Sequence, residues 1–344
     1  MHINDFEEAI MNCRFCFMCR HLSTIGQVRC TEVDTPRVRA AMLYGLRTGT
    51  NSFDDSDFVD ALYRQDLSGS CRRNCVNGYD EVGLSIAARQ DVVEAGKAPA
   101  KVVKLAKKLA ASSAWKAAGK GKVAIFIDET TAADAAEVAA LRKLMAKAAG
   151  DYVVITGGAI GKSLKVLGYE SEAKAAAEKF TAFVNGLDVS EIVFPNPAAY
   201  DFALADLKAF GLKLNAKVFC LAKYLLEKKV KFAKKAGELY YLADDFMRNY
   251  VGCECPEKLL NALGAVNRPF GTNDEESYNC GEGAIVLDKL EPKLVKLLAE
   301  YVAARADDPK KDQIVTLGVY AKTQLAKYGK LNVKTLAEIA AACL

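Results

Sequence analysis

The sequence predicts an α+β chain of several domains, with a helical N-terminal domain followed by two duplicated α/β lobes. The first observation is that six of the eleven cysteines fall within the first 75 of 344 residues. The second is a change of composition at Pro99, after which Ala, Lys and Leu dominate. The third is the alternation of strand-like and helix-like segments from there on, which is typical of parallel strands joined by crossover helices.

These observations give four stretches. Residues 1–98 hold the first six cysteines and form the helical domain. Residues 99–120 read as a linker, with one amphipathic helix over 100–120 that is broken by the glycines at 119 and 121. Residues 121–228 form the first α/β lobe, and residues 229–344 form the second.

Within the first lobe, short apolar runs predict strands and 3.6-residue periodicity predicts helices. The expected strands are 123–127, 152–155 and 191–194, and the expected helices are 132–149, 171–187 and 198–210. A short segment and a helix over 216–227 close the lobe.

The second lobe repeats this order. A glycine-bearing turn at 156–158 and another at 279–281 each precede a long helix, then a strand, then a helix. Gly158 lies 36 positions before Phe194, and Gly281 lies 35 positions before Thr316. We expect a helix over 287–305 and a strand over 313–317, and a short segment and a helix over 331–342 close the lobe. A repeat of about 110 residues is too long for a solenoid unit and predicts two facing lobes.

Charge and hydropathy exclude several classes of protein. The 47 basic and 43 acidic residues give a net charge of +4, and no basic run is interleaved with aromatic residues, so no nucleic-acid partner is expected. No run of about 18 apolar residues occurs, so we expect no integral membrane span. The acidic start does not resemble a signal peptide, and we expect a cytoplasmic protein whose thiols are reduced. Clustered thiols in such a compartment bind metal or do redox work.

The first cysteines form a C-x2-C-x2-C run. Three thiolates on one tight loop, from Cys13, Cys16 and Cys19, fit three corners of a [4Fe–4S] cluster, with the fourth ligand from elsewhere in the chain. Zinc is the main alternative because it also accepts four thiolates, although zinc sites usually use separated pairs. Free thiols are the remaining alternative.

These residues resemble a known family. The run from Cys13 to Ser23, followed by Asp34-Thr-Pro-Arg37-Val-Arg39, is similar to the N-terminal iron–sulfur domain of the heterodisulfide reductase and glycolate oxidase iron–sulfur subunits. The family's second motif corresponds here to Gln65, Ser68, Cys71 and Cys75. The resemblance covers nearly the whole chain, is specific at the N-terminus, and implies a helical ferredoxin-like domain before two cysteine-rich lobes.

The resemblance also implies the ligands. In the family, the first three cysteines of one motif share a cluster with the last cysteine of the other. Cys13, Cys16, Cys19 and Cys75 therefore form one complete set. The other set would be Ser23, Gln65, Ser68 and Cys71, which has one thiol, so we expect one [4Fe–4S] cluster and not two. Cys30 and Cys71 are expected to be packed thiols.

The lobes depart further from the family. Thr156-Gly157-Gly158 stands where Cys-Cys-Gly is expected, and Ala243-Asp244-Asp245-Phe246 replaces His-Asp-Pro-Cys. Cys253, Cys255 and Cys280 remain as a second thiol site, with loop thiols left by a decayed site as the alternative. Cys220 and Cys343 are expected in the core.

Residues 157–163 imitate a phosphate loop. The required pattern is G-x4-G-K-[ST], and its first glycine would fall on Thr156. The spacing is one residue short, so nucleotide binding is not expected.

Two functions remain open. The first, implied by the resemblance, is an electron-transfer subunit of an anaerobic oxidoreductase complex, without catalytic residues of its own. It would relay single electrons to or from a flavoprotein subunit of the 2-hydroxy-acid dehydrogenase type, and further to a ferredoxin, an electron-transferring flavoprotein or a quinone-linked protein. The second is a disulfide-type reductase with its active centre at Cys253, Cys255 and Cys280. Phe15, Phe17 and Met18 either shield the cluster or contact the partner.

Overall fold

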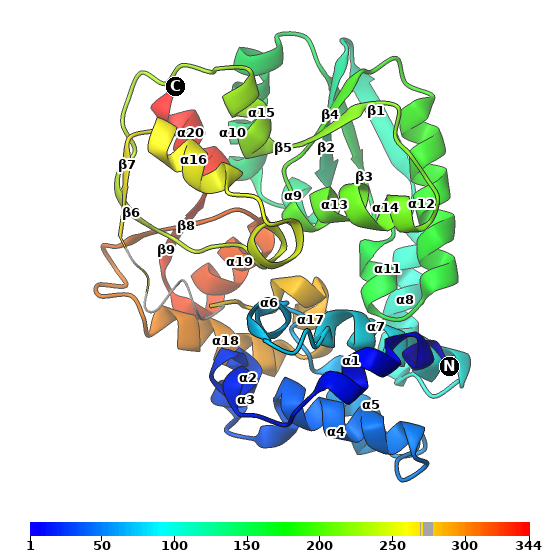
Figure 1. The fold of residues 1–344 in the computed structure, drawn as a ribbon. Coiled ribbons are helices and arrows are strands. Elements are labelled where there is room, and N and C mark those ends of the chain that lie inside the picture. Colours follow the sequence, from blue (N-terminus) through cyan, green and yellow to red (C-terminus); the bar gives the residue numbers. More distant parts are fainter. Residues whose placement is uncertain (269, 271–277) are drawn as a thin grey trace.

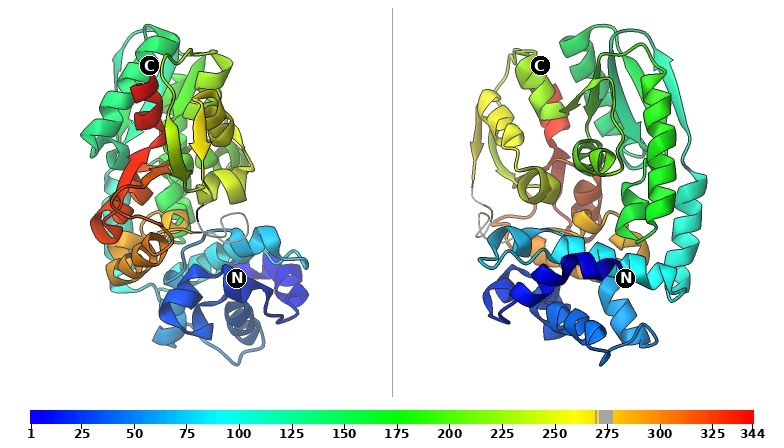
Figure 2. Two further views of the ribbon diagram at one scale, coloured as in Figure 1. Left: turned by 90° about the vertical axis from the view of Figure 1, so that its left-hand side faces the viewer. Right: turned by 45° about the vertical axis from the view of Figure 1, so that its right-hand side comes forward.

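The computed structural model describes residues 1–268, 270 and 278–344. It is a mixed α/β protein in which the N-terminal helices lie below two sheets (Figure 1). The two further views in Figure 2 keep these helices on the same side of both sheets. Within the described ranges, no helix has the length and apolar character needed to cross a bilayer.

The N-terminal region is helical because its caps are encoded locally. Thr35 accepts a hydrogen bond from the Val38 amide, and Pro36 begins the helix, which is where proline is best tolerated. Asp80 caps the longest of these helices through the Gly83 amide. The helices are η1 (His2–Phe6), α1 (Glu7–Asn12), α2 (Met18–Leu22), α3 (Thr24–Arg29), η2 (Glu32–Asp34), α4 (Pro36–Arg47), α5 (Ser56–Tyr63), α6 (Ser70–Asn74) and α7 (Glu81–Glu94).

The expected helix over 100–120 is wrong in its second half. Helix α8 (Ala100–Ala111) ends before two serines, and β1 (Trp115–Gly119) follows as a strand antiparallel to β3 (Val153–Gly157). The Trp115 ring packs on Phe180, with ring centroids 5.2 Å apart, and its indole N–H donates to the Gly158 carbonyl at 3.2 Å. Tertiary packing of the indole therefore overrides the helical composition of this segment.

The first sheet has the order β1-β3-β2-β4-β5, and only β1 is antiparallel. The expected strands and helices of this region are confirmed with small shifts of their ends. Phe180 from α12 packs between the rings of Phe126 and Phe194 on one face of the sheet. The elements are β2 (Val123–Asp128), α9 (Glu129–Ala132), α10 (Ala135–Ala149), α11 (Lys162–Val166), α12 (Glu170–Asn185), β4 (Glu191–Phe194), α13 (Pro197–Asp201), η3 (Phe202–Asp206), α14 (Leu207–Ala209), β5 (Lys217–Cys220) and α15 (Leu221–Glu227).

The second sheet is parallel throughout, with the order β7-β6-β8-β9. The helix expected over 287–305 is divided at Glu291, because Pro292 begins a new helix there. The elements are β6 (Gly237–Tyr241), η4 (Phe246–Val251), α16 (Cys255–Ala262), β7 (Ala265–Asn267), η5 (Glu282–Ala284), α17 (Leu287–Leu290), α18 (Pro292–Ala303), β8 (Gln313–Thr316), α19 (Val319–Gln324), η6 (Leu325–Gly329), β9 (Asn332–Thr335) and α20 (Leu336–Cys343).

The two sheets correspond strand by strand. Without β1, the first sheet reads β3-β2-β4-β5, and the second reads β7-β6-β8-β9 in the same chain order. The helices between the sheets also correspond. In chain order, helices α10 and α16 follow the first of the four corresponding strands in their sheets, and α20 and α15 follow the last. Helix α10 contacts α20, and α16 contacts α15. Likewise α13 contacts η4, and α19 contacts α9. Each contact thus has a counterpart with the two sheets exchanged, which is the pattern of a two-fold relation. Figure 1 shows α10, α15, α16 and α20 side by side between the sheets.

Candidate metal centre

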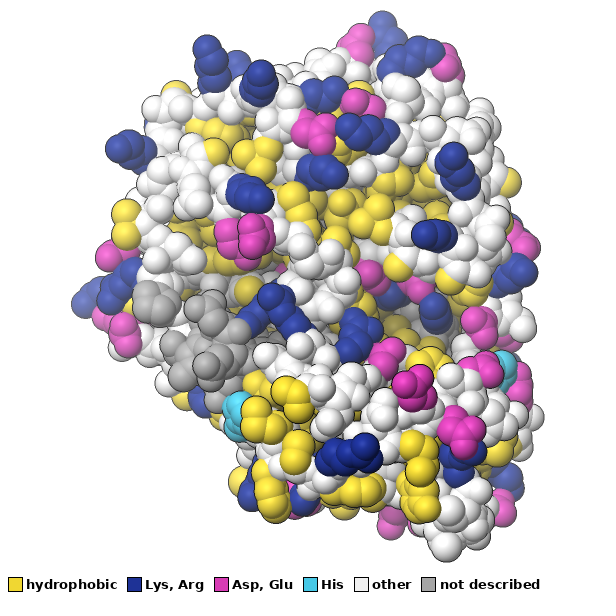
Figure 3. All heavy atoms as spheres, viewed as in Figure 1, with side chains coloured by type: hydrophobic (Ala, Val, Ile, Leu, Met, Phe, Trp, Pro, Cys, Tyr) yellow, Lys and Arg dark blue, Asp and Glu magenta, His cyan; other side chains and the backbone are white. Residues whose placement is uncertain are grey.

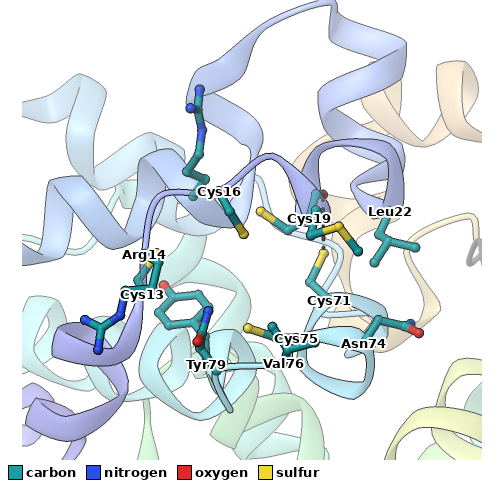
Figure 4. Close-up of a pocket in the computed structure, with 13 residues that line it drawn as sticks. Cys13, Arg14, Cys16, Cys19, Leu22, Cys71, Asn74, Cys75, Val76 and Tyr79 are labelled. Carbon is teal, nitrogen blue, oxygen red and sulfur yellow. Dashed lines mark hydrogen bonds between the residues drawn. The ribbon is translucent and has the colours of Figure 1, made fainter.

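Five cysteines line one cavity among the N-terminal helices. Figure 4 shows the sulfurs of Cys16, Cys19, Cys71 and Cys75 around a common space, which Cys13 also lines. Cys13 follows α1, Cys16 lies in the loop before α2, and Cys19 lies in α2. The other two thiols, Cys71 and Cys75, come from α6 and the residue after it. The structure therefore brings together all four cysteines predicted as ligands and adds Cys71.

The loop between α1 and α2 turns sharply. Phe15 has a φ of 51°, a left-handed conformation that side chains other than glycine rarely adopt. This turn lies between Cys13 and Cys16, and helix α2 begins directly after Phe17. The short C-x2-C spacings thereby present three sulfurs from one side of the cavity, while α6 supplies two from the other (Figure 4).

The lining of the cavity is mostly apolar. Its other lining residues include Leu22, Val76 and Tyr79. Arg37 also reaches this site, with its guanidinium 4.4 Å from the centre of the Phe17 ring. A mostly apolar space lined by several thiols suits a thiolate-bound metal centre.

Burial controls the protonation of these thiols. It raises the pKa values of Cys13 and Cys19, and the neighbouring thiols raise them further. Burial also raises the pKa of Cys71 well above its ordinary value. Without a cation, the site therefore favours thiols, and a metal that stabilises thiolates would release protons on binding.

Cys71 and Cys75 differ in their surroundings. Cys71 is buried, and its thiol donates to the carbonyl oxygen of Cys19 at 3.7 Å. Cys75 is half-buried and acts electrostatically on Cys13 across the cavity. The thiol of Cys71 thus already has a hydrogen-bond acceptor, whereas Cys75 faces the C-x2-C-x2-C loop.

The polar members of the second ligand set lie at buried positions, and the amide nitrogen and oxygen of Gln65 have no hydrogen-bond partner among the described residues. Ser23, Gln65 and Ser68 are buried. Ser23 donates to the carbonyl of Asp34 at 3.0 Å and caps α3 through the Gly26 amide. Cys30, expected to be packed, is exposed at the end of α3, with its thiol 3.4 Å from the Gln27 carbonyl.

A second group of thiols lies between the two sheets, and its membership differs from the prediction. The sulfurs of Cys220, Cys253 and Cys255 lie within 4.8 Å of one another. Cys253 and Cys255 are joined as a disulfide. Cys280 is outside this group: it is buried, and its amide donates to Glu282 at 2.7 Å. Cys343 is buried in the core as expected.

The carboxyl ends of the strands in the second sheet carry acids in place of thiols. Asp244 and Glu282 are buried there, and burial together with their mutual repulsion raises the pKa of Glu282. Burial raises the pKa of Asp244 to about 7. These groups hold protons near neutral pH and present no thiol for catalysis.

The loop that imitates a phosphate-binding motif is closed by ion pairs. Lys162 is buried, and its Nζ lies 2.6 Å from carboxylate oxygens of both Asp201 and Asp206. Gly157 and Gly158 serve a packing role, because a Cβ at either position would overlap backbone of the segment before β1. The lysine is therefore committed to structural ion pairs within the protein.

Comparisons with known proteins leave the family open. No protein-family model matches the chain, and no curated protein matches it by sequence.

Two thiols in these sites were assigned otherwise from the sequence. Cys220 was expected to be a core residue, and it is buried, but it also contacts the C-x-C pair 33 positions away. The sequence predicts Cys71 as a packed thiol outside the ligand set, and it is buried, but it also lines the cavity. Its place in α6, four residues before Cys75, which directly follows that helix, is the signal that it faces the same cavity.

Proposed function

We propose that this chain is an iron–sulfur electron-transfer protein with one [4Fe–4S] cluster in the N-terminal cavity. The observation that carries the proposal is the convergence of five thiols, from two motifs about fifty residues apart in sequence, on one apolar cavity. Zinc remains the rival metal for the same thiols. When bound, the cluster supplies one-electron transfer.

We infer that Cys13, Cys16, Cys19 and Cys75 hold the cluster. The hydrogen bond from Cys71 to the Cys19 carbonyl, and the position of Cys75 opposite Cys13, support Cys75 as the fourth ligand. In this arrangement, Cys71 packs beside the cluster and fixes the backbone of α2. The resemblance to the heterodisulfide reductase and glycolate oxidase iron–sulfur subunits points to the same four residues.

The proposed architecture is a helical ferredoxin-type domain followed by two duplicated α/β lobes. The equal strand orders and the exchanged helix contacts of the two sheets support the duplication. The described strand ends of the lobes carry buried acids and ion pairs in place of catalytic thiols. In this proposal the lobes therefore serve as a scaffold for partner proteins.

The rim of the cavity is a suitable docking surface for a flavoprotein partner. Phe15, Phe17, Met18 and Val76 are exposed there, Val76 to 85%. Figure 3 shows hydrophobic side chains gathered on the N-terminal helices at the lower part of that face. Exposed apolar patches of this kind mark interaction sites. A flavin separates electron pairs into single electrons, which is the form that one cluster accepts.

The first test is a count of iron and acid-labile sulfide in chain purified or reconstituted without oxygen. About four irons and about four sulfides per chain are expected for one cubane cluster. A zinc-loaded chain without sulfide would contradict the proposal. A count near eight irons would show a second centre.

The ligand assignment is tested by two matched variants. Cys75→Ser is expected to lose most of the cluster, because an alcohol oxygen replaces a thiolate ligand. Cys71→Ser is expected to retain it, since that side chain donates a hydrogen bond rather than binding iron. Iron content and the absorbance of the cluster give the readout. The reverse pattern would assign Cys71 as the fourth ligand.

The alternative function, a disulfide-type reductase, is tested with the isolated cluster-loaded chain. An electron-transfer subunit is expected to show no reduction of disulfides and no oxidation of hydroxy acids in the absence of a flavoprotein. Activity that disappears in Cys253→Ser would instead place the active centre at the C-x-C pair.

A further inference from the structure

Three thiols from three separate elements meet between the two sheets. Cys220 ends β5 and precedes α15, Cys253 follows η4, and Cys255 begins α16. All three sulfurs lie within 4.8 Å of one another. No other residue type belongs to this group among the described residues, so its donor set is sulfur alone.

The backbone around these thiols is fixed. The amide of Cys253 donates to the Met247 carbonyl at 2.9 Å, and the amide of Cys255 donates to the Cys253 sulfur at 3.3 Å. Gly252, with a φ of 65°, allows the turn before the pair, and Pro256 restricts the first turn of α16. The C-x-C geometry is therefore set before any ligand binds.

The three thiols differ in burial, with one deep in the protein and two closer to solvent. Cys220 is buried and lines a small apolar cavity together with Met247, whereas Cys253 and Cys255 are half-buried. Amides of α15, from Ala222 and Lys223, face the Cys220 sulfur. An ion can thus enter from the side of the C-x-C pair and reach the third sulfur behind it.

We propose that the reduced chain binds one thiophilic d10 metal ion, Zn²⁺ or Cu⁺, through Cys220, Cys253 and Cys255. Soft thiolate donors select these ions over Mg²⁺ and Ca²⁺, which prefer oxygen ligands. For tetrahedral Zn²⁺, three sulfurs leave one coordination position for water or another ligand. This site is separate from the N-terminal cavity and does not depend on the proposed cluster.

Reduction is a condition for binding. A small dithiol reduces the Cys253–Cys255 bond by giving two electrons and two protons, and it becomes a disulfide itself. The metal then displaces the three thiol protons into the buffer. Cys220 ends β5 of the first sheet, and the C-x-C pair lies in the connection between β6 and β7 of the second. The bound ion would therefore link the two halves.

The test compares metal content of the full-length chain, reduced under argon, freed of reductant and dialysed separately against Zn²⁺ and Cu⁺. Wild type is expected to hold one equivalent more of Zn²⁺ or of Cu⁺ than Cys220→Ser, Cys253→Ser and Cys255→Ser. Cys280→Ser and Cys343→Ser are matched controls, buried cysteines outside the group, and are expected to keep that equivalent. The two dialyses distinguish the ions.

Several results would overturn the proposal. One is equal metal content, for both ions, in wild type and the three variants. Another is loss of the equivalent in Cys280→Ser. A third is a reduced wild-type chain that binds no extra equivalent of Zn²⁺ or Cu⁺ and in which Cys253 and Cys255 form their disulfide again. Cys253 and Cys255 are half-buried, so their variants serve if Cys220→Ser does not fold, as judged by circular dichroism.

The comparison stays valid whatever fills the N-terminal cavity. Iron is counted in the same samples, and ions taken up by Cys13, Cys16, Cys19 and Cys75 are common to wild type and all variants. If no cluster assembles in the N-terminal cavity, the difference in metal content between wild type and Cys253→Ser therefore stays the same. A second readout is the melting temperature, which the ion is expected to raise more in wild type, Cys280→Ser and Cys343→Ser than in the three variants of the site.

Discussion

At the scale of single residues, buried acids near the second sheet couple stability to pH. Glu282 accepts a hydrogen bond from the Cys280 amide at 2.7 Å and is buried beside Asp244. Burial raises its pKa far above the range of an exposed carboxyl group. The folded chain therefore binds a proton that the unfolded chain releases at neutral pH.

Glu282→Gln is expected to remove this pH dependence. A raised folded-state pKa gives stability that is complete below the unfolded pKa and is lost as the pH rises through the folded value. The free energy of unfolding of the variant should therefore equal that of wild type at about pH 5 and exceed it at about pH 8, by on the order of 1–2 kcal/mol. Urea unfolding at both pH values measures the difference. An equal gain at both pH values would contradict the titration argument.

At the scale of elements, one arginine joins the ends of two helices. Arg89 in α7 is buried, and it donates to the carbonyl of Leu62 at 2.7 and 2.9 Å and to that of Val166 at 2.6 Å. These carbonyls lie in the last turns of α5 and α11, where cations are favoured. The guanidinium thereby connects the N-terminal helices to the first sheet.

Arg89→Met is expected to destabilise the chain by about 2–4 kcal/mol, because two buried carbonyls lose their donors. Relief of the desolvated charge offsets part of this cost. Chemical denaturation gives the magnitude. Arg142→Met, an exposed position on α10, is the control and should change stability by less than about 0.5 kcal/mol. A neutral Arg89→Met would show that other donors replace the guanidinium.

The elements also show which parts of the fold the sequence predicts. A run of five apolar residues predicts strand β2, and in the structure this strand is buried on both faces. Strand β1 was missed because Lys116, Ala117 and Ala118 favour helix, and only pairing with β3 and packing of Trp115 make them a strand. The C-x2-C-x2-C run predicted that Cys13, Cys16 and Cys19 lie together. The approach of Cys220 to the C-x-C pair depends on the contact between the sheets, which local spacing does not encode.

At the scale of the whole molecule, the second sheet supports the segment that carries Cys71 and Cys75. Asn249 donates to the Ser68 carbonyl at 2.9 Å, and Arg73 donates to the Arg248 carbonyl at 2.6 Å. A Cβ on Gly283 would overlap the Leu67 carbonyl oxygen, so the two backbones meet without room for a side chain. Folding of the C-terminal half therefore positions the thiols of the N-terminal half.

Gly283→Ala is expected to push these backbones apart, at a cost of about 1–3 kcal/mol from overpacking. It should lower the unfolding midpoint and reduce the iron retained after gel filtration. Gly186→Ala is the control, since its new methyl group would make only ordinary contacts at 3.4 and 3.5 Å. Full retention of iron in a destabilised Gly283→Ala would show that this contact supports the fold but not the thiols.

The exchanged helix contacts between the two sheets also limit how the chain can assemble. In a two-fold arrangement each half packs on the other through the same helices, so α10, α15, α16 and α20 are engaged in contacts within the chain. Such an interface is closed: it cannot add a third half, and it cannot propagate into a filament. Any higher assembly of this protein must therefore grow from its outer faces.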